Sequence, residues 1–240
     1  MNRTKRITKE KLIIDAAEKT FAAVGFLNAT MGEIAEKIEM SKGSVYFYFS
    51  SKENLYMAVT YRAWQALLDR HYYCLQFVKS KNGFETTAEL FKVAMEFAEE
   101  HPYYFELIMN FIALMRSANQ QKLAKDKVRE ALEDSIYYRK ILDINNLPLS
   151  IVTKEIERGQ KDGSIKNQRN PVLLYLSAWA LLTGYMTLNA SNSKSGKSTI
   201  FRVDIEYWRH YTMKMVQDIL NDEIECDYQK QETLEVIPEF

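Results

Sequence analysis

Apolar residues recur every three or four positions along most of this chain, and the strict alternation that a half-buried strand produces is rare. Only eight Gly and four Pro are available to interrupt helices. The pattern therefore predicts an all-α fold. The first helix is expected from about Thr8 to Val24, where Gly25 can end it. Its inward stripe is predicted to consist of Ile13, Ala16, Ala17, Thr20, Phe21 and Val24.

Polar capping residues predict where the next three helices begin. Thr30 and Glu33 have the spacing of a capping box, in which each side chain bonds the backbone N–H of the other residue. Ser41 can cap a third helix, and Ser50 or Ser51 can cap a longer fourth one. The inward residues are expected to be Ile34, Ala35, Ile38, Val45, Phe49, Leu55, Ala58, Val59, Ala63, Ala66 and Leu67. Three short helices with a tight connection between the second and third have the outline of a helix-turn-helix unit.

Helices are predicted for most of the remaining chain as well. They span about 84–100, 102–116, 120–143, a segment that ends near 159–163, then 172–186 and 204–220, with a polar loop at 192–198. The apolar run from Val172 to Met186 contains polar and small residues and is shorter than the roughly 18 apolar residues that suggest a membrane span. We therefore expect this helix to be buried in protein, and we expect no membrane partner.

Charge changes this picture only locally, because 32 Lys and Arg balance 32 Asp and Glu over the whole chain. The first eleven residues carry five basic side chains against Glu10, so this end is the candidate partner for a polyanion. Residues 222–240 carry seven acidic side chains against Lys230 and are expected to form a flexible tail. The basic end lacks the apolar core of a secretory signal, and Cys74 and Cys226 have neither disulfide-framework nor zinc-finger spacing. A cytoplasmic protein is expected.

The N-terminal part also carries a specific pattern, spread over about Thr8 to Val59. It consists of Gly25-Phe26, Thr30, Ile34-Ala35, Ser41-Lys42-Gly43, Tyr46, Tyr48-Phe49, Lys52-Glu53 and Leu55. This pattern resembles the DNA-binding signature of the TetR family of bacterial regulators. Beyond it, the chain is similar to that family only in size and helical layout. The resemblance implies a helix-turn-helix DNA-binding domain in residues 1–50 and a larger helical domain, residues 51–221, for effector binding and dimerisation.

The third predicted helix is suited to contact DNA at its N-terminus. Gly43 leaves the start of the helix without a side chain, so the backbone can approach a groove. Ser41, Lys42 and Ser44 offer hydroxyl and ammonium donors to phosphate, and Lys42 can instead reach a guanine edge. The residues predicted to contact DNA are Thr30, Ser41, Lys42, Gly43, Ser44, Tyr46, Phe47, Tyr48 and Lys52.

Tyr46, Phe47 and Tyr48 are three aromatic residues in a row, which on a helix cannot all face one core, so at least one is exposed. By the family pattern, the Tyr48 hydroxyl contacts a phosphate, and Lys52 and Thr30 do so from neighbouring helix starts. Phe47 stands where the family is variable. An exposed Phe47 ring could pack on a thymine methyl or a sugar, or it could be a loosely packed surface aromatic, and both interpretations stay open.

Aromatic and methionine side chains crowd the middle of the chain. The helix after Pro102 is apolar on nearly every side and must be covered all round. Each of these residues can be ordinary core, but methionine beside aromatic rings also suits a cavity for an apolar or flat ligand. The resemblance implies an effector pocket of this kind. The candidate lining residues are Trp64, His71, Phe97, Tyr104, Ile108, Met109, Ile112, Met115, Tyr137 and Trp179.

The resemblance also implies a homodimer, in which the last two long helices pair with their symmetry mates in a four-helix bundle. Ala178 and Gly184 are small enough to permit close approach. A twofold dimer presents two recognition helices, which enter successive major grooves when they lie roughly 34 to 36 Å apart. A palindromic operator in double-stranded DNA is therefore the expected target.

The sequence thus predicts a transcriptional repressor that is released from its operator by a small apolar or aromatic effector, and not an enzyme. The alternative is a regulator of the same build without a small-molecule inducer, acting as an activator or through a protein partner. A remote alternative is a nucleotide-binding helical enzyme, because Ser195–Ser198 ends like a phosphate-binding loop, although Ser191 stands where that motif needs glycine. His71 and Cys74 have a spacing that could share a metal, but no second pair accompanies them. No metal site, cofactor or catalytic residue is predicted.

Overall fold

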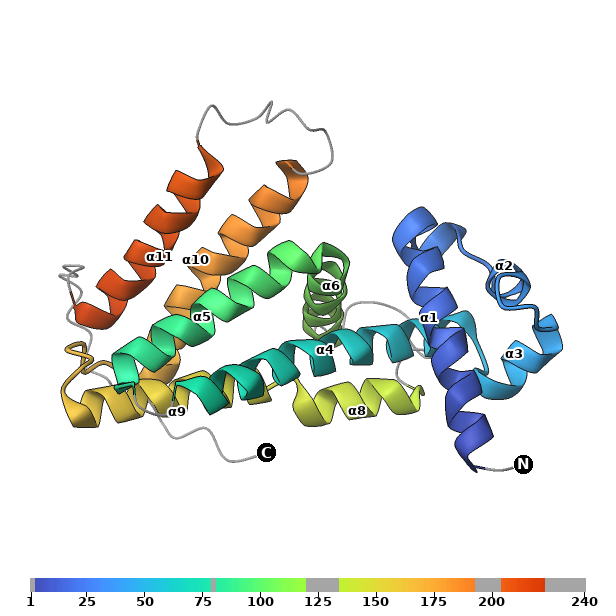
Figure 1. The fold of residues 1–240 in the computed structure, drawn as a ribbon, viewed down its shortest axis with the longest axis horizontal. Coiled ribbons are helices and arrows are strands. Elements are labelled where there is room, and N and C mark those ends of the chain that lie inside the picture. Colours follow the sequence, from blue (N-terminus) through green and yellow to red (C-terminus); the bar gives the residue numbers. More distant parts are fainter. Residues whose placement is uncertain (1–2, 79–80, 120–133, 193–203, 223–240) are drawn as a thin grey trace.

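The computed structural model describes residues 3–78, 81–119, 134–192 and 204–222, and every regular element in these ranges is a helix, as predicted (Figure 1). The helices are α1 (Arg3–Asn28), α2 (Met31–Glu36), α3 (Lys42–Tyr48), α4 (Lys52–Phe77), α5 (Gly83–Glu100), α6 (Pro102–Asn119), α8 (Ile136–Ile144), α9 (Leu147–Asp162), α10 (Pro171–Asn192) and α11 (Ile205–Asn221). We call α1–α3 the head and the part built from α5–α11 the body. Most of the predicted helix at 120–143, nearly all of the polar loop at 192–198, Cys226 and all but the first residue of the acidic tail lie outside the described residues.

The predicted starts of α2, α3 and α4 are confirmed. Thr30 Oγ1 accepts the Glu33 backbone N–H at 3.2 Å, and the Glu33 carboxylate accepts the Thr30 N–H at 2.9 Å. Ser41 and Ser51 each accept the backbone N–H three residues further on, at 3.1 and 3.0 Å. The first turn of a helix leaves N–H groups without intrahelical partners, so these side chains decide where each helix begins.

The first helix begins earlier than predicted, at Arg3. It is kinked at Gly25, whose φ of 77° and ψ of 160° are not helical. The stripe from Ile13 to Phe21 is buried as predicted, but Val24 is 46% exposed and was wrongly included. After the kink the chain returns to the core through Phe26, whose ring centre lies 5.9 Å from that of Phe21. Gly25 therefore redirects the chain, since a residue without Cβ tolerates a positive φ.

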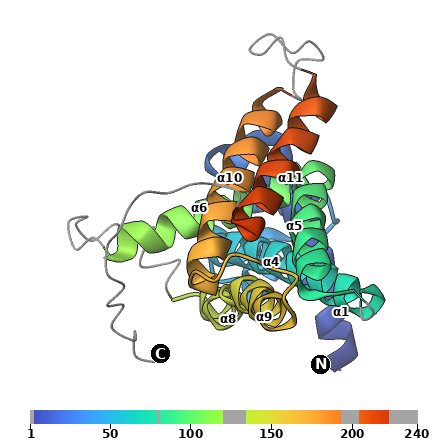
Figure 2. The ribbon, with the colours of Figure 1, turned by 90° about the vertical axis from the view of Figure 1, so that its left-hand side faces the viewer.

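α4 is the central axis of the molecule (Figure 1). It contacts α1 in the head and α5, α6, α8 and α9 in the body. α10 and α11 contact each other side by side as an antiparallel pair that projects from the body, as the two ribbon views show (Figures 1 and 2). The head and the projecting pair thus lie at different ends of the molecule, with α4 between them.

α5 and α9 cross where two glycines meet. A Cβ on Gly83 would collide with the backbone of Gly159, and a Cβ on Gly159 would lie 2.6 Å from the Ile165 side chain. Interiors are packed too tightly to absorb such an addition without a shift of backbone. The two helices can therefore approach this closely only because neither residue has a side chain.

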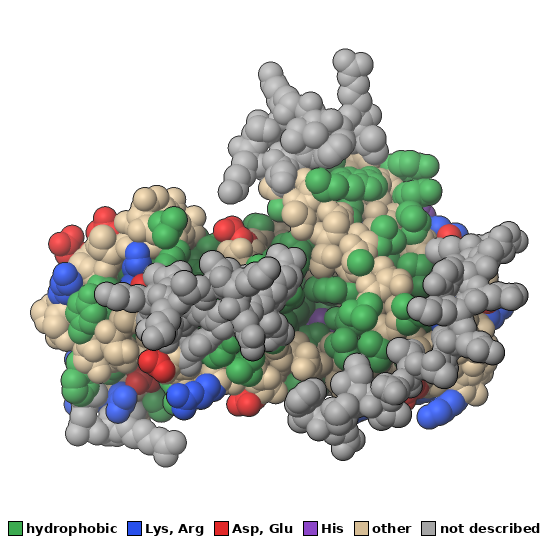
Figure 3. Space-filling view, turned by 180° about the vertical axis from the view of Figure 1, so that it is seen from behind, with side chains coloured by type: hydrophobic (Ala, Val, Ile, Leu, Met, Phe, Trp, Pro, Cys, Tyr) green, Lys and Arg blue, Asp and Glu red, His purple; other side chains and the backbone are tan. Residues whose placement is uncertain are grey.

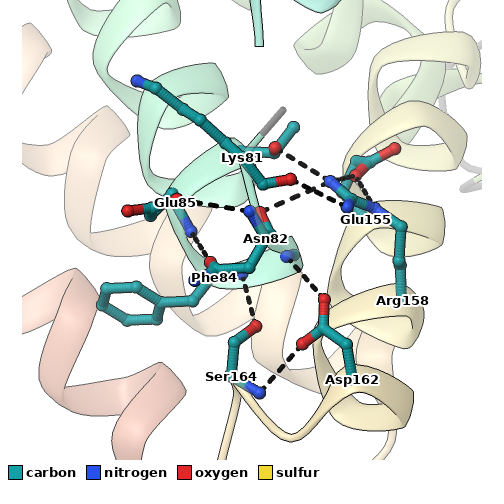
Figure 4. Close-up of polar contacts among 10 residues, drawn as sticks. Lys81, Asn82, Phe84, Glu85, Glu155, Arg158, Asp162 and Ser164 are labelled. Carbon is teal, nitrogen blue, oxygen red and sulfur yellow. Dashed lines mark hydrogen bonds and ion pairs between the residues drawn. The ribbon is translucent and has the colours of Figure 1, made fainter. Parts of the chain in front are cut away.

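Polar contacts hold the same crossing (Figure 4). The Arg158 guanidinium of α9 donates to the Lys81 carbonyl oxygen at 3.0 Å. The Asp162 carboxylate accepts the Ser164 and Gly83 backbone N–H groups, each at 2.9 Å. Hydrogen bonds from Ser164 and from the Gly83 N–H hold the pKa of the Asp162 carboxyl below its usual value. The start of α5 is thereby tied to the end of α9.

Two clusters of buried apolar side chains stabilise the fold. The first joins Phe21 and Phe49 of the head to Trp64 of α4 and Phe111 of α6. The second lies mainly among α5, α9, α10 and α11. Because the first cluster includes residues on both sides of position 50, packing is continuous there, and the division of the chain into domains at that position stays a prediction.

α10 is apolar all round, but only one of its faces is covered. Its segment Pro171–Ala190 is the one stretch, among the described residues, that by length and composition could cross a membrane, a test that core helices of soluble proteins also pass. Leu174, Ala178 and Leu182 are buried in the second cluster, whereas Leu173 is exposed. The predicted burial of this helix is confirmed for one face only. Ala178 belongs to that inner face, so the expectation that it faces a symmetry mate is wrong.

Candidate nucleic-acid interface and ligand pocket

Two apolar side chains hold α3 against the head and leave its outer face exposed. Val45 and the residue that ends the helix, Phe49, are buried in the first cluster. Tyr46 is 43% exposed and Phe47 is 69% exposed. Residues four apart lie on one face of a helix, so the burial of Val45 and Phe49 turns the residues between them outward. Two of the three consecutive aromatic residues are therefore exposed.

Polar groups gather at the N-terminus of α3. Ser41 Oγ lies 2.8 Å from Ser44 Oγ, so the two hydroxyls share a hydrogen bond. The Lys42 ammonium lies 6.0 Å from the centre of the Tyr46 ring, within reach of a cation–π attraction. A Cβ on Gly43 would meet nothing within 4 Å, so the fold itself does not require glycine there. The open space at Gly43 is compatible with the close approach of another molecule.

Thr30 and Tyr48 lie at the neighbouring helix ends. The exposed Thr30 hydroxyl uses its oxygen to accept the Glu33 N–H and still has a proton to donate. Tyr48 is half-buried, and its ring meets that of Phe47 edge-on, with centres 5.3 Å apart. The phosphate contacts expected of both residues stay predictions.

The structure corrects the expectation for Lys52. Its ammonium donates to the backbone carbonyls of Phe26 and Leu27, in the last turn of α1, at 2.8 and 3.2 Å, and to that of Ala29, just after α1, at 3.0 Å. The negative end of a helix dipole lies there, and an ammonium has three N–H donors, so all three are used inside the head. The ring centre of Phe26 also lies 4.5 Å from the ammonium nitrogen. Lys52 thus joins α4 to α1, and a phosphate contact by this residue is not supported.

The first turns of α1 add positive charge to the surface of the head. Lys5, Lys9 and Lys11 are exposed, and Arg6 pairs with Glu10 at 2.9 Å. Basic side chains concentrated on one part of a neutral protein attract polyanions over a distance of about a Debye length. The head therefore combines these charges with the exposed face of α3.

A cavity of about 330 Å³ lies in the body, between α4, α5, α6, α9, α10 and the turn that joins α8 to α9. Seen from behind, the body has a hollow bordered by hydrophobic side chains (Figure 3). Six of the ten predicted lining residues are in the wall of the cavity, namely Trp64, His71, Ile108, Ile112, Met115 and Trp179.

The other four predicted lining residues have different surroundings. Phe97 is part of the first core cluster, and Met109 packs against the second. Tyr104 donates its hydroxyl to a carboxylate of α1 at 2.9 Å, and the Tyr137 ring stacks on Phe49 with centres 6.1 Å apart. These four residues lie outside the wall of this cavity, because residues that are equally apolar fill both core and cavity wall, and the sequence pattern does not distinguish the two.

The wall also contains residues that the sequence analysis did not select. They are Leu67, Phe91, Ala94, Asn145, Asn146, Pro148, Leu149, Val152, Tyr175 and Leu176. Asn145 and Asn146 lie between the predicted helix at 120–143 and the next one, and nothing in the sequence marks this break as part of a cavity wall. Phe91 and Tyr175 stack with ring centres 6.0 Å apart, but they come from α5 and α10, and nothing local in the sequence joins them.

The polar groups of the wall are uncharged. None of the lining residues that the structure describes is Asp, Glu, Lys or Arg. His71 Nδ1 lies 2.9 Å from the Leu67 carbonyl oxygen, and burial lowers the pKa of this imidazole, so the neutral ring donates its Nδ1–H. Trp64 Nε1 and Asn145 Oδ1 are buried without a hydrogen-bond partner, while Asn145 Nδ2 donates to Met115 Sδ at 3.2 Å.

His71 and Cys74 do not form a metal site. Although three residues apart, His71 lines the cavity and Cys74 packs in the second cluster. Within the described part of the chain, no three His, Cys, Asp or Glu side chains are grouped so that they could hold a metal ion. The loop Ser195–Ser198, on which the nucleotide-binding alternative depends, lies outside the described residues.

Comparison with known proteins supports the pattern found in the head. Residues 13–59 match the family model described as bacterial regulatory proteins, tetR family. The uncharacterised HTH-type transcriptional regulator YhgD of Bacillus subtilis (strain 168) is 25% identical over 182 residues, which are 76% of this chain and 83% of YhgD. YuxN, an uncharacterised HTH-type regulator of the same organism, is 47% identical over 51 residues, so the aligned part spans 21% of this chain but only 18% of YuxN.

Solved structures share the fold over nearly the whole chain. PfmR, a TetR family regulator of Thermus thermophilus, is similar with a TM-score of 0.56 at 15% identity, covering 87% of this chain and 96% of PfmR. Bacillus subtilis FadR in complex with stearoyl-CoA has a TM-score of 0.56 at 15% identity, covering 86% of this chain and 96% of FadR. Residues 13–59 therefore carry the DNA-binding domain of the TetR family of bacterial regulatory proteins, and the chain as a whole shares the fold of TetR family regulators.

Proposed function

We propose that this protein is a cytoplasmic transcriptional repressor whose homodimer binds a palindromic operator and leaves it when a small apolar or aromatic effector binds in the body. The observation that carries the proposal is the course of α4 (Figure 1). This helix begins at Lys52, next to the recognition helix α3, and supplies Trp64, Leu67 and His71 to the cavity wall. A ligand that displaces α4 therefore acts on the head without an intermediate element.

The exposed face of α3 supports operator binding. Lys42 suits a phosphate or a guanine edge, and the Phe47 ring suits a thymine methyl. Ser41 and Ser44 supply hydroxyl groups beside the open space at Gly43. Hydroxyl and ammonium contacts to phosphate set the position of a protein on DNA, while contacts to base edges set the sequence.

The outer face of α10 supports the homodimer. Leu173, Leu176, Ala180, Gly184 and Leu188 follow one another every three or four residues, and all of them are exposed. An apolar stripe of this length on a soluble protein indicates an interface, and the small residues in it allow two helices to approach closely. Pairing this stripe with its symmetry mate would give a twofold dimer with two recognition helices.

The ion pairs and hydrogen bonds at the start of α4 support the proposed release. Lys52 is bonded to the end of α1, and Arg62 Nη1 lies 2.7 Å from Asp15 and 2.8 Å from Glu18, both on α1. A displacement of α4 should therefore move α1, and with it the whole head, as one rigid unit. Release further requires that the effector binds more tightly to the dimer whose heads are not spaced to enter the DNA than to the DNA-bound dimer.

Selection from random duplex DNA by the purified full-length protein tests the proposal. The expected result is an enriched inverted repeat. Replacing both Lys42 and Phe47 by Ala should weaken binding to the selected site at least about tenfold, because base contacts are each worth roughly 1–3 kcal/mol. Lys154→Ala is the matched control, since this exposed lysine lies on α9, outside the head, and its loss should leave the affinity unchanged.

Three outcomes contradict parts of the proposal. No enriched sequence at low salt would remove operator binding. A reporter gene that is expressed more strongly when the protein occupies the operator would make the protein an activator. Operator complexes that no compound of a metabolite panel dissolves, together with no thermal shift of the protein, would favour a regulator without a small-molecule inducer.

A further inference from the structure

The inward face of α1 continues beyond the core of the head as a basic face. Ile13 is the first buried residue that the structure describes in this helix, and residues 4–12 are all exposed except the partly buried Glu10. Lys9 lies four residues before Ile13, and Lys5 lies four residues before Lys9. Residues four apart share one face of a helix. Lys5 and Lys9 therefore lie on the side of α1 that, one turn further on, packs against the rest of the head.

This basic face begins close to the C-terminal end of α3. Burial raises the pKa of Tyr137, and the charges of Glu10 and Arg6 also act on its hydroxyl. The Tyr137 ring stacks on Phe49, the residue that ends α3, with centres 6.1 Å apart. The N-terminal end of α1 protrudes from the head, at the end of the molecule away from α10 and α11 (Figure 1). A molecule bound along α3 therefore lies close to the first turns of α1.

Among the described residues, Lys5 and Lys9 have no partner of opposite charge. No described carboxylate lies within ion-pair distance of either ammonium group, whereas Arg6 is paired with Glu10 at 2.9 Å. Like charges four residues apart repel each other, and cations near the start of a helix oppose its dipole, so both effects destabilise this part of α1. Anionic groups beside the two ammonium groups would remove this repulsion.

The dimensions of DNA make phosphate the group that these lysines meet. α3 has seven residues and is about 10 Å long, and the major groove that admits such a helix is about 12 Å wide. The two phosphate backbones border this groove, so side chains beside an end of α3 face a backbone and not base edges. In homeodomains, which also have three helices, the segment before the first helix contacts DNA next to the groove that the recognition helix occupies.

From these observations we infer that Lys5 and Lys9 bind backbone phosphates of double-stranded DNA beside the groove that α3 enters. The contact lies outside the helix-turn-helix unit and before residues 13–59, which match the family model. It adds affinity but no sequence preference, because phosphates carry no sequence information. The inference rests on the proposed function, since α3 brings the head to the DNA.

The salt dependence of operator binding tests the inference. In the full-length protein, Lys5→Gln together with Lys9→Gln should reduce the slope of log affinity against log salt by about 3 to 4, because a dimer loses four contacts of about 0.9 each. The affinity for the selected operator should fall at least about tenfold near 0.1 M salt. Fluorescence anisotropy of the labelled duplex measures both quantities. Lys5→Arg together with Lys9→Arg should keep the slope, because both charges are kept.

Two controls separate this contact from a general effect of charge. Lys154→Gln together with Lys161→Gln removes the same charge from exposed positions of α9 and should leave the slope and the affinity unchanged. The wild type should bind an operator trimmed to its outermost specified base pairs more weakly than one with about one further helical turn at each end, whereas the double Gln variant of α1 should bind both equally. Thermal unfolding should find this variant at least as stable as the wild type, because the repulsion is removed.

An unchanged slope in the folded double Gln variant of α1 would overturn the inference but not the proposed function, because α3 would still select the operator. A different inverted repeat selected by this variant would mean that the two lysines read bases, which also overturns it. If the wild type binds DNA without sequence preference and the variant still reduces the slope, the phosphate contact stands and operator recognition fails. If the wild type binds no duplex at low salt, both fail.

Discussion

The Lys52 ammonium makes three hydrogen bonds to carbonyl oxygens at the end of α1, although Lys52 itself is the first residue of α4. A cation at the C-terminal end of a helix is favourable because the unpaired carbonyls there carry partial negative charge. This side chain therefore stabilises the junction between head and body.

Lys52→Met keeps the apolar stem and removes the charge, so it should lower the free energy of unfolding by about 1–2 kcal/mol. Urea denaturation measures this change, and Lys154→Met, on the exposed side of α9, should have almost no effect. Because the three N–H donors of the Lys52 ammonium are used within the head, the dependence of operator affinity on salt should keep its slope. Unchanged stability with a reduced slope would restore the phosphate contact expected from the sequence.

His71 should make stability depend on pH. Burial lowers the pKa of its imidazole in the folded protein below the value of about 6.5 that it has in the unfolded chain. Between these two values the unfolded chain binds a proton that the folded protein excludes, so the free energy of unfolding falls as pH falls below about 6.5. His71→Gln should show a smaller loss of stability than the wild type between pH 7.5 and 5.5 in urea titrations. Equal losses in both proteins would contradict a buried neutral His71.

At the scale of helices, the close approach of α5 to α9 depends on glycine. The Gly83 and Gly159 backbones meet where α5 crosses α9, and Arg158 and Asp162 hold the crossing by hydrogen bonds (Figure 4). In the sequence, Gly83 stands just before a predicted helix, and Gly159 stands near the predicted end of another. Their second role was hidden, because it arises between residues that are far apart in the chain.

Gly159→Ala should destabilise the protein by about 1–3 kcal/mol, the usual cost of overpacking, because the added methyl lies 2.6 Å from Ile165. Gly43→Ala is the matched control, since its Cβ has open space and alanine favours helix. Its stability should be unchanged or slightly higher. Thermal unfolding of the two variants checks this, and equal melting temperatures would mean that α5 and α9 are less tightly packed than described.

At the scale of the whole molecule, α10 contributes both to the core of one protomer and to the proposed dimer interface. One of its faces completes the second core cluster, and the other carries the exposed apolar stripe described above. A helix that is apolar on both faces is stable in water only if both faces are covered. A symmetry-related copy is the cover that the proposed function supplies.

Leu173→Glu places a charge in this stripe and should weaken the dimer at least about tenfold, because a charge buried in an apolar interface is left without a partner. Sedimentation analysis should then find monomers, and operator binding should fall with the loss of the second head. Leu142→Glu is the control, since Leu142 is similarly exposed but lies on α8. A dimer that survives Leu173→Glu would place the interface elsewhere.

The sequence by itself determined where α2, α3 and α4 begin and which family the head resembles. Capping by Thr30, Ser41 and Ser51 acts over three residues, and the apolar period acts within one helix, so both can be read locally. The exposed aromatic residues of α3 followed from the same local geometry.

Only the tertiary structure decided which apolar residues are core and which line the cavity. Phe97 and Ile112 are both apolar positions of predicted helices, and the difference between them is what other helices place beside them. The same holds for Lys52, whose partners are the last carbonyls of another helix, and for Asn145, whose oxygen was buried by distant segments. Burial and pairing are properties of neighbours in space, and those neighbours are brought together only when the chain folds.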